Sequence, residues 1–408
     1  MKRIMLVTAV MSFLCFQSYS ESPVQVSVLK NDLTLTAIPY LYEKTVLFQD
    51  YSEGFIYLRT VDIESRQVVN IRKNSKYLYP LAFSGSHVSW IEYTYQIKYG
   101  APKPGSPAQA DTLVKYFVKA MNVSDKSESS LTNDTTYKEH IAAYGDKVVW
   151  TDYRHFTPGD TTVEIYLYDF TQKKETRITN AKGYKAFPHI YGNKIVWQDY
   201  RNAAPGSNNA DIYLYDLQSQ TEITVTTNTA FQSQPQVFEN LVVWQDYRNA
   251  GGDEKNADIY LKDLTSGSEK VICSAPGFQN VQKIFGNYIV WQDYRNALSD
   301  TLNADLYLYD MSKGEEFPIT TKSGYQGEAF LWGNHITWQD YADGFLYLGV
   351  ISPLSSVHNR VIRSQFGVSE GVQYFGLSGR KMSSEQGPNK LILKLDANGK
   401  VKRITEIR

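Results

Sequence analysis

Short apolar and aromatic runs, each about the length of a strand, recur along the chain and are separated by polar turn residues. The clearest marker of this pattern is a tryptophan, usually followed by Gln-Asp-Tyr. It occurs every 47 residues, at Trp150, Trp197, Trp244, Trp291 and Trp338, and the register continues upstream through Trp90 and Phe48. A period of roughly 40–50 residues is typical of propellers and solenoids. The pattern therefore predicts seven copies of one structural unit.

Each copy contains four short runs. An aromatic residue lies 13 positions before the tryptophan, and a Gly-Asn or Gly-Asp pair such as Gly192-Asn193 suits a tight hairpin turn. A second run such as 211–216 and a Thr-rich run such as 221–226 follow. The runs are rich in Val, Ile, Tyr and Trp, and none shows a helical period. We predict an all-β fold, a seven-bladed β-propeller of four-stranded blades. The predicted blade cores are 33–73, 77–133, 137–180, 184–227, 231–274, 278–321 and 325–365.

Two details of this ring follow from the same alignment of repeats. The second copy is longer than the others, and residues 94–112 are predicted to be an inserted surface loop. A propeller must also close on itself. The segment 24–29 is predicted to pair with the last blade, and residues 359–363 are the alternative closing strand.

The runs Asp-Ile-Tyr-Leu-Tyr-Asp at 211–216 and Asp-Leu-Tyr-Leu-Tyr-Asp at 305–310 resemble those of the TolB-like and WD-type propeller families. The resemblance covers most of residues 21–365 and implies a closed propeller domain. Such propellers serve as scaffolds, lectins and enzymes, so the resemblance does not define an activity.

The two ends of the chain carry other signals. Residues 1–20 have a basic start, an apolar run and small residues, as in a signal peptide. Its removal takes away Cys15 and leaves Cys273 without a disulfide partner in the chain. Residues 366–408, with Leu-Ser-Gly-Arg-Lys at 377–381 and a basic end, resemble the sorting domain of type IX secretion cargo. A peripheral hairpin that caps the ring is the alternative. We expect a protein that is secreted or on the outer cell surface, with the periplasm as the alternative.

Composition limits the classes of partner. The formal charge of −1 provides no basic field for nucleic acid, and a chain that is 42% hydrophobic can bury a large core as a monomer. No nucleotide-binding fingerprint, zinc spacing or serine-hydrolase elbow is present, so we expect no cofactor. Loops 203–210, 250–257 and 297–304 could hold structural calcium, but they add only Asp253 and Asp300, which favours solvated loops.

The arginine four residues after the tryptophan is the most informative charged position. An acidic residue two positions after the tryptophan and a tyrosine three positions after it occur in every copy, which favours structural roles. The arginine occurs only in four adjacent copies, at Arg154, Arg201, Arg248 and Arg295. One interpretation is a structural pair such as Asp199–Arg201, on the same side of the strand. The other is a cationic arc whose guanidinium groups bind carboxylates.

Three histidines concentrate in the third and fourth copies: His140, His155 and His189. Together with tyrosine and arginine they resemble the residues used by propeller polysaccharide lyases, including the ulvan and oligogalacturonate lyase families. That resemblance implies a base, an acid and a carboxylate neutraliser, for which we select His140, Tyr184 and Arg201, with His189 as a substitute for either of the first two. It also implies substrate binding by Arg154, His155, Tyr200, Arg248 and Arg295.

Three functions therefore stay open. The first is a lyase that cleaves uronate-containing polysaccharide by β-elimination. The second is a non-catalytic propeller that binds glycan or protein, and the third is a TolB-like envelope scaffold. The partners would be an acidic polysaccharide or an envelope protein, with the secretion machinery engaging residues 366–408. An export-like tail favours the first two.

Overall fold

The computed structural model describes residues 22–30, 38–74, 76–99, 110–157, 161–204, 207, 209–251, 256–297 and 303–352, and four strands within 372–407. Strands and turns make up these residues. Nowhere in this described part does a helix occur that could cross a membrane. The chain divides into two compact units, Met1–Pro353 and Leu354–Arg408.

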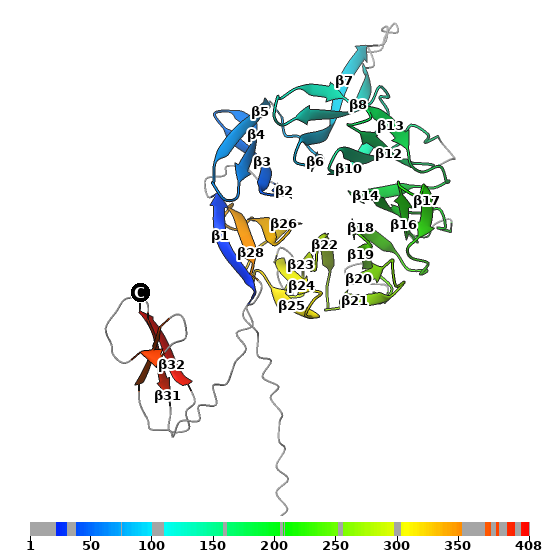
Figure 1. Ribbon diagram of the computed structural model, residues 1–408. Helices are drawn as coiled ribbons and strands as arrows, with labels where there is room; N and C mark the ends of the chain where they lie inside the picture. The colour runs from blue at the N-terminus through cyan, green and yellow to red at the C-terminus, as the bar shows by residue number, and fades with distance from the viewer. Residues whose placement is uncertain are drawn as a thin grey trace, which may run out of the picture. The chain divides into compact units, whose positions relative to one another are not determined.

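The first unit is a ring of seven four-stranded antiparallel sheets, as predicted (Figure 1). In the first six blades the strands run in chain order from the axis outward. The first three blades are β2 (Tyr40–Tyr42), β3 (Thr45–Ser52), β4 (Phe55–Asp62) and β5 (Val68–Asn74); β6 (Leu81–Phe83), β7 (His87–Tyr99), β8 (Ala110–Asn122) and β9 (Glu128–Ser130); and β10 (Lys138–Tyr144), β11 (Lys147–Asp152), β12 (Glu164–Asp169) and β13 (Lys174–Arg177).

The next three blades repeat the same order with the most regular spacing. They are β14 (Lys185–Tyr191), β15 (Lys194–Asp199), β16 (Asp211–Asp216) and β17 (Thr221–Thr224); β18 (Gln232–Phe238), β19 (Leu241–Asp246), β20 (Asp258–Asp263) and β21 (Glu269–Cys273); and β22 (Gln279–Phe285), β23 (Tyr288–Asp293), β24 (Asp305–Asp310) and β25 (Glu315–Pro318).

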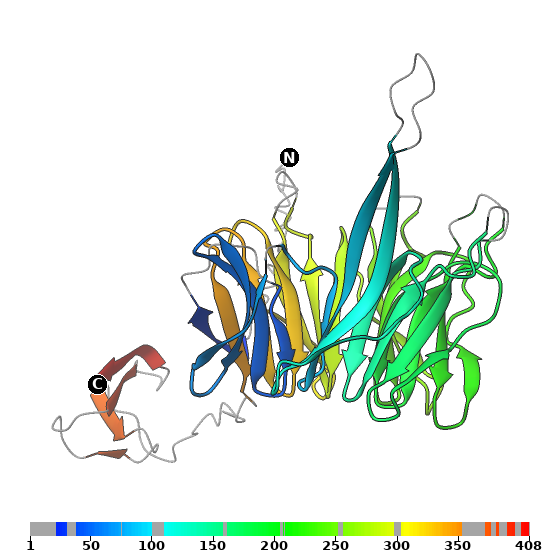
Figure 2. The ribbon, with the colours of Figure 1, turned by 90° about the horizontal axis from the view of Figure 1, so that it is seen from above.

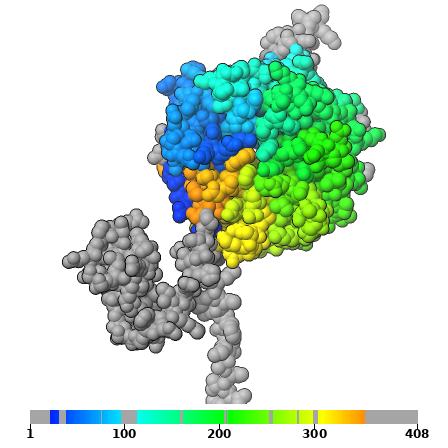
Figure 3. Space-filling view, in the orientation of Figure 1, coloured from blue at the N-terminus to red at the C-terminus, as the bar shows by residue number. Residues whose placement is uncertain are grey.

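The seventh blade closes the ring. It consists of β26 (Gln326–Trp332), β27 (His335–Asp340), β28 (Leu346–Ile351) and, as its outer strand, β1 (Val24–Lys30). β1 pairs antiparallel with β28, from Val24 opposite Ile351, which confirms the predicted closing segment. The space-filling view shows the first and last blades, blue and orange, side by side (Figure 3). The alternative closing residues, 359–363, lie outside the described residues.

The repeated tryptophans form the core between blades. Five of them are fully buried and Trp338 is 2% exposed. The indole Nε1 of Trp197 donates to Asp199 at 2.8 Å, and the other regular repeats do the same. The glutamine after the tryptophan binds the next blade: Gln245 Nε2 donates to the Gln279 carbonyl at 2.9 Å. Apolar packing and these bonds together fix the blades side by side.

One sequence expectation is wrong. Within the predicted loop 94–112, residues 94–99 and 110–112 are paired strand, because β7 and β8 continue to Tyr99 and Ala110, while 100–109 lie outside the described residues. The alternation of aromatic and polar residues from Tyr93 onward has the two-residue period of a strand, which explains the pairing.

The second unit contains a four-stranded antiparallel sheet of β29 (Val372–Gly376), β30 (Lys381–Met382), β31 (Lys390–Leu395) and β32 (Val401–Ile407). The proposed signal peptide, residues 1–20, lies outside the described residues. Its role and the sorting role of residues 366–408 stay predictions.

Candidate functional site

The innermost strands carry a bulge that turns one side chain toward the axis. In five blades the pairing of the first two strands shifts register, and four of them share the same two-residue bulge. The residue ten positions before the tryptophan then has a positive φ: His140 (49°), Phe187 (51°), Gln234 (49°) and Glu328 (55°). A positive φ is uncommon for residues other than glycine, and bulges redirect side chains next to binding sites. The repeat thus places its most variable position at the centre of the ring.

These side chains line one cavity of about 590 Å³, here called the central pocket. Every blade contributes to it from its first strand or the residues just before it (Figure 1). The residues eight positions before each marker also face it in six blades: Tyr40, Ala142, His189, Gln236, Lys283 and Phe330. A cavity of this size suits a small molecule or a few sugar units.

A ring of aromatic side chains, here called the aromatic plug, closes the other end of the axis. It is formed by Tyr42, Tyr144, Tyr191, Phe238, Phe285 and Trp332, each six positions before its marker. Neighbouring ring centres lie between 4.1 Å, for Tyr42–Trp332, and 6.4 Å, for Tyr42–Tyr144. The inner strands end at this plug, so the central pocket faces the end where they begin.

One wall of the central pocket is charged. Lys283 Nζ lies 3.2 Å from Gln236 Oε1 and 4.9 Å from the centre of the Phe330 ring. Among the described residues no carboxylate lies within 4.0 Å of this amine. Burial lowers the pKa of Lys283 to about 8, against the opposing effect of Glu328. Burial also raises the pKa of the Glu328 carboxyl, and Lys283 counteracts this in part.

His189 is held as a neutral hydrogen-bond donor. Its Nδ1 accepts the backbone N–H of Val237 at 3.2 Å, which leaves the proton on Nε2. Burial and the nearby Lys283 lower the pKa of this imidazole well below its ordinary value. His189 can therefore donate a hydrogen bond to a ligand.

His140 lies on β10 of the neighbouring blade and differs from His189 in its partners. Its ring packs against Phe187, with centres 4.0 Å apart. Nδ1 lies 3.5 Å from Glu139 Oε1 but makes no hydrogen bond with any described residue. Burial lowers the pKa of this imidazole, while Glu139 opposes the shift. Nδ1 is buried beside Glu139, so Nε2 is the nitrogen of this neutral imidazole that is suited to accept a proton from a ligand in the pocket.

The Glu139 carboxylate accepts hydrogen bonds from three tyrosine hydroxyls at the edge of the pocket. Tyr184 donates to its Oε1 at 2.6 Å, Tyr153 to the same oxygen at 2.8 Å, and Tyr137 to Oε2 at 3.1 Å. Tyr184, the predicted acid, thus lies behind Glu139 and does not line the central pocket. Burial and Glu139 raise its pKa, which keeps the phenol protonated.

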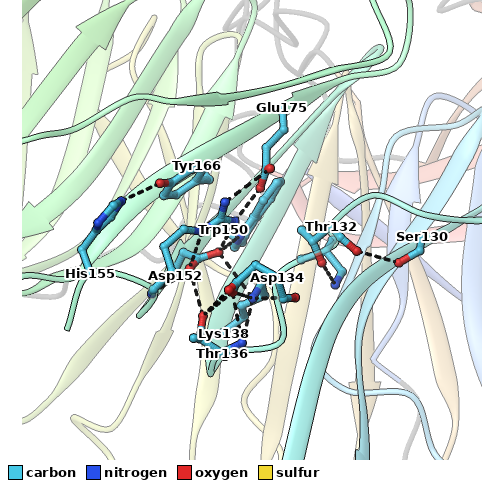
Figure 4. Close-up of polar contacts among 12 residues, drawn as sticks. Ser130, Thr132, Asp134, Thr136, Lys138, Trp150, Asp152, His155, Tyr166 and Glu175 are labelled. Atoms are coloured by element: carbon cyan, nitrogen blue, oxygen red, sulfur yellow. Dashed lines mark hydrogen bonds and ion pairs between the residues drawn. The ribbon is translucent and has the colours of Figure 1, made fainter. Parts of the chain in front are cut away.

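The four repeat arginines point toward the outer strands. Arg201 donates to the buried Asp199 at 2.6 Å and to Glu222 of β17 at 2.6 Å. Its guanidinium also lies 3.9 Å from the centre of the Tyr213 ring. The same arrangement holds Arg154, Arg248 and Arg295. Figure 4 labels the third-blade Asp152, Glu175 and Tyr166, which are the residues that contact Arg154.

The structure therefore brings together only part of the predicted set. His140 and His189 line the central pocket, while Arg154, Arg201, Arg248 and Arg295 do not. This geometry supports the structural Asp–Arg pair. His155 Nε2 is 2.8 Å from the Tyr166 hydroxyl, and Tyr200 accepts from Gln198 at 2.7 Å, so both also lie outside the central pocket. Their binding roles stay predictions.

Sequence reasoning missed Lys283, Glu328 and Glu139. For Lys283 and Glu328 a usable signal was present, since the positions eight and ten before the tryptophan change chemistry from blade to blade. No group of three or more His, Cys, Asp or Glu suited to a metal ion occurs among the residues described here. The acidic residues Asp253 and Asp300 of the candidate calcium loops lie outside them.

Comparison with known proteins identifies the fold. No protein-family model matches the chain, and no curated protein matches its sequence significantly. Among solved structures, an oligogalacturonate lyase from Vibrio parahaemolyticus has a TM-score of 0.53 at 11% identity, covering 82% of this chain and 96% of that one. An acylaminoacyl peptidase from Pyrococcus horikoshii has a TM-score of 0.50 at 13% identity, with 74% of this chain and 50% of that one covered.

TolB from Acinetobacter baumannii is also similar, with a TM-score of 0.41 at 14% identity and coverage of 75% of this chain and 79% of that one. These neighbours carry unrelated functions on one architecture. At such identities the likeness shows the propeller fold alone.

Proposed function

We propose that this protein binds an acidic glycan whose carboxylate lies against Lys283 in the central pocket. The observation that carries the proposal is the Lys283 amine, which is partly buried and has no carboxylate within 4.0 Å in the described part of the chain. A cation taken out of water is costly unless it is paired, and a bound anion would supply the partner.

The opposite wall fits the rest of a uronate. Tyr79, Tyr137 and Phe187 line the pocket and are 65%, 42% and 37% exposed. Aromatic faces can pack against the apolar face of a sugar ring, while Gln234, Gln236 and the Nε2–H of His189 offer hydrogen bonds to hydroxyl groups. A pocket with a cationic wall and an aromatic wall suits a sugar that bears a carboxylate.

A second candidate, β-elimination, rests on the neutral imidazole of His140, which lines the central pocket. In this mechanism Lys283 neutralises the carboxylate in place of Arg201, and His140 takes the proton beside the carboxylate. The C–O bond to the leaving sugar breaks as the ring double bond forms. His140, now protonated, gives its proton to the leaving oxygen, and the Nε2–H of the neutral His189 stabilises that oxygen by a hydrogen bond. Secretion or display on the outer cell surface would bring the protein to such a substrate.

Titration calorimetry with short uronate oligosaccharides tests binding, with neutral oligosaccharides of equal length as controls. We expect heat only from the acidic sugars, and its loss in Lys283→Met. Lys270→Met is a matched control, because Lys270 Nζ also lies over an aromatic ring, Tyr309 at 5.3 Å, outside the pocket. Equal binding by both variants would overturn the proposal. Ultraviolet absorbance of an unsaturated product separates cleavage from binding.

A further inference from the structure

The second blade carries a projection that the other blades lack. β7 and β8 pair from His87–Asn122 to Tyr99–Ala110 and rise from one face of the ring (Figure 2). The paired strand segments 93–99 and 110–116 are here called the arm. A two-stranded ribbon adds little to the stability of a fold by itself. The exposed side chains of this one are therefore candidates for contact with a ligand.

One face of the arm is aromatic and continues directly from the central pocket. Directly paired residues share a face, which places Tyr93 with Tyr116 and Tyr95 with Val114. Tyr93 and Tyr116 line the central pocket, and Tyr95 follows one step further out. Tyr93 is 48% and Tyr95 68% exposed, although large aromatic groups usually avoid such exposure. The other face presents Thr94, Lys115 and Leu113.

The base of the arm repeats the chemistry of the pocket wall. The exposed Lys76 places its Nζ 4.6 Å from the centre of the Tyr93 ring, as Lys283 lies 4.9 Å from that of Phe330. The ring of Tyr116 connects the two sites, with centres 6.2 Å from Tyr93 and 4.9 Å from Tyr137. A cation beside an aromatic face thus occurs both inside the pocket and outside it.

We propose that the aromatic face of the arm binds further units of the same acidic glycan whose carboxylate lies at Lys283. This inference rests on the proposed function and adds that the ligand is a polymer chain. Its sugar rings stack on Tyr93 and Tyr95, and a second carboxylate lies near Lys76. Continuity with the pocket and the repeated cation–aromatic pair select a glycan chain over a protein partner.

The test measures the affinity of the Tyr95→Ala variant and of the wild type for a long uronate chain and for a uronate disaccharide. We expect its affinity for the long chain to fall about tenfold and its affinity for a disaccharide to stay unchanged, since only the long chain reaches Tyr95. Leu113→Ala is the matched control, because Leu113 is 45% exposed on the other face of the same arm. It should bind both ligands as the wild type does.

The outcomes separate the two proposals. If short chains bind and Tyr95→Ala leaves long-chain affinity unchanged, the arm proposal is overturned and the pocket proposal stands. If no uronate binds the wild type, the proposed function fails and the arm proposal fails with it. Self-association of the wild type that Tyr95→Ala abolishes, without any effect on glycan binding, would assign the face to a second copy and overturn the arm proposal.

Discussion

Replacing Lys283 with methionine should make the protein more stable while it abolishes ligand binding. Burial lowers the pKa of Lys283 from its ordinary 10.5 to about 8. At 1.36 kcal/mol for each pH unit, this difference corresponds to at most about 3 kcal/mol of unfavourable free energy. Loss of the hydrogen bond to Gln236 offsets about 1 kcal/mol. Solvent screening in the pocket reduces the cost of the buried charge. We therefore expect Lys283→Met to raise the free energy of unfolding by about 1–2 kcal/mol.

The pH dependence has a definite sign. Below about pH 8 the amine is protonated in both the folded and the unfolded chain, so the full cost of the buried charge is present. Between about pH 8 and 10.5 the unfolded chain binds more protons, so the contribution of Lys283 to the free energy of unfolding rises with pH. The advantage of Lys283→Met should therefore be largest below pH 8 and shrink above it.

Urea unfolding of wild type and variant across this pH range measures the difference. Methionine keeps the length of the apolar stem, so packing against Phe330 changes little. A variant that is less stable than the wild type below pH 8 would show that Lys283 already has a favourable partner in the free protein. The reasoning from an uncompensated cation would then be refuted.

Three further changes test other parts of the molecule. Arg201→Ala leaves the buried Asp199 without its ion pair and should lower the free energy of unfolding by about 3 kcal/mol, with no change in glycan affinity; unchanged stability with lost binding would instead support the cationic arc. Trp332→Ala removes a member of the aromatic plug and should cost about 3 kcal/mol in urea unfolding; a cost below 1 kcal/mol would mean that the plug does not support the ring. His140→Ala should cost under about 1 kcal/mol, because its Nδ1 makes no hydrogen bond, yet abolish any formation of unsaturated product; full activity would remove the base assignment.

The propeller ring could be predicted from the sequence because the residues that build each blade recur at a fixed interval. Each copy repeats the buried tryptophan, its Asp partner and the turn before it, where Gly145, Gly192, Gly286 and Gly333 all have positive φ. Pairing of the segment 24–29 with the last blade was one of two predicted closures, and the structure confirms it. The arm was missed because its length departs from the repeat.

The candidate site was only partly predictable, for a physical reason. Alternation along a strand indicates which side a residue takes, but Arg201 follows β15 in a turn where alternation no longer applies. It turns back to Asp199 and outward to Glu222. Lys283 and Glu328 reach the axis through bulges in β22 and β26, which shift the register locally. The sequence shows that the residue type at these positions varies, but simple strand alternation does not show that they face the axis.

The pairing of β1 with β28 also constrains when the ring can close during synthesis and folding. Ser27 Oγ donates to the carbonyl of Leu348, 321 residues further along the chain, so this contact forms after nearly all of the propeller has been synthesised. Contacts of such long sequence separation slow folding. Until then β28 presents an unpaired edge. At high concentration β1 of a second copy can occupy that edge, and the first assembly error we expect is an exchanged-strand dimer.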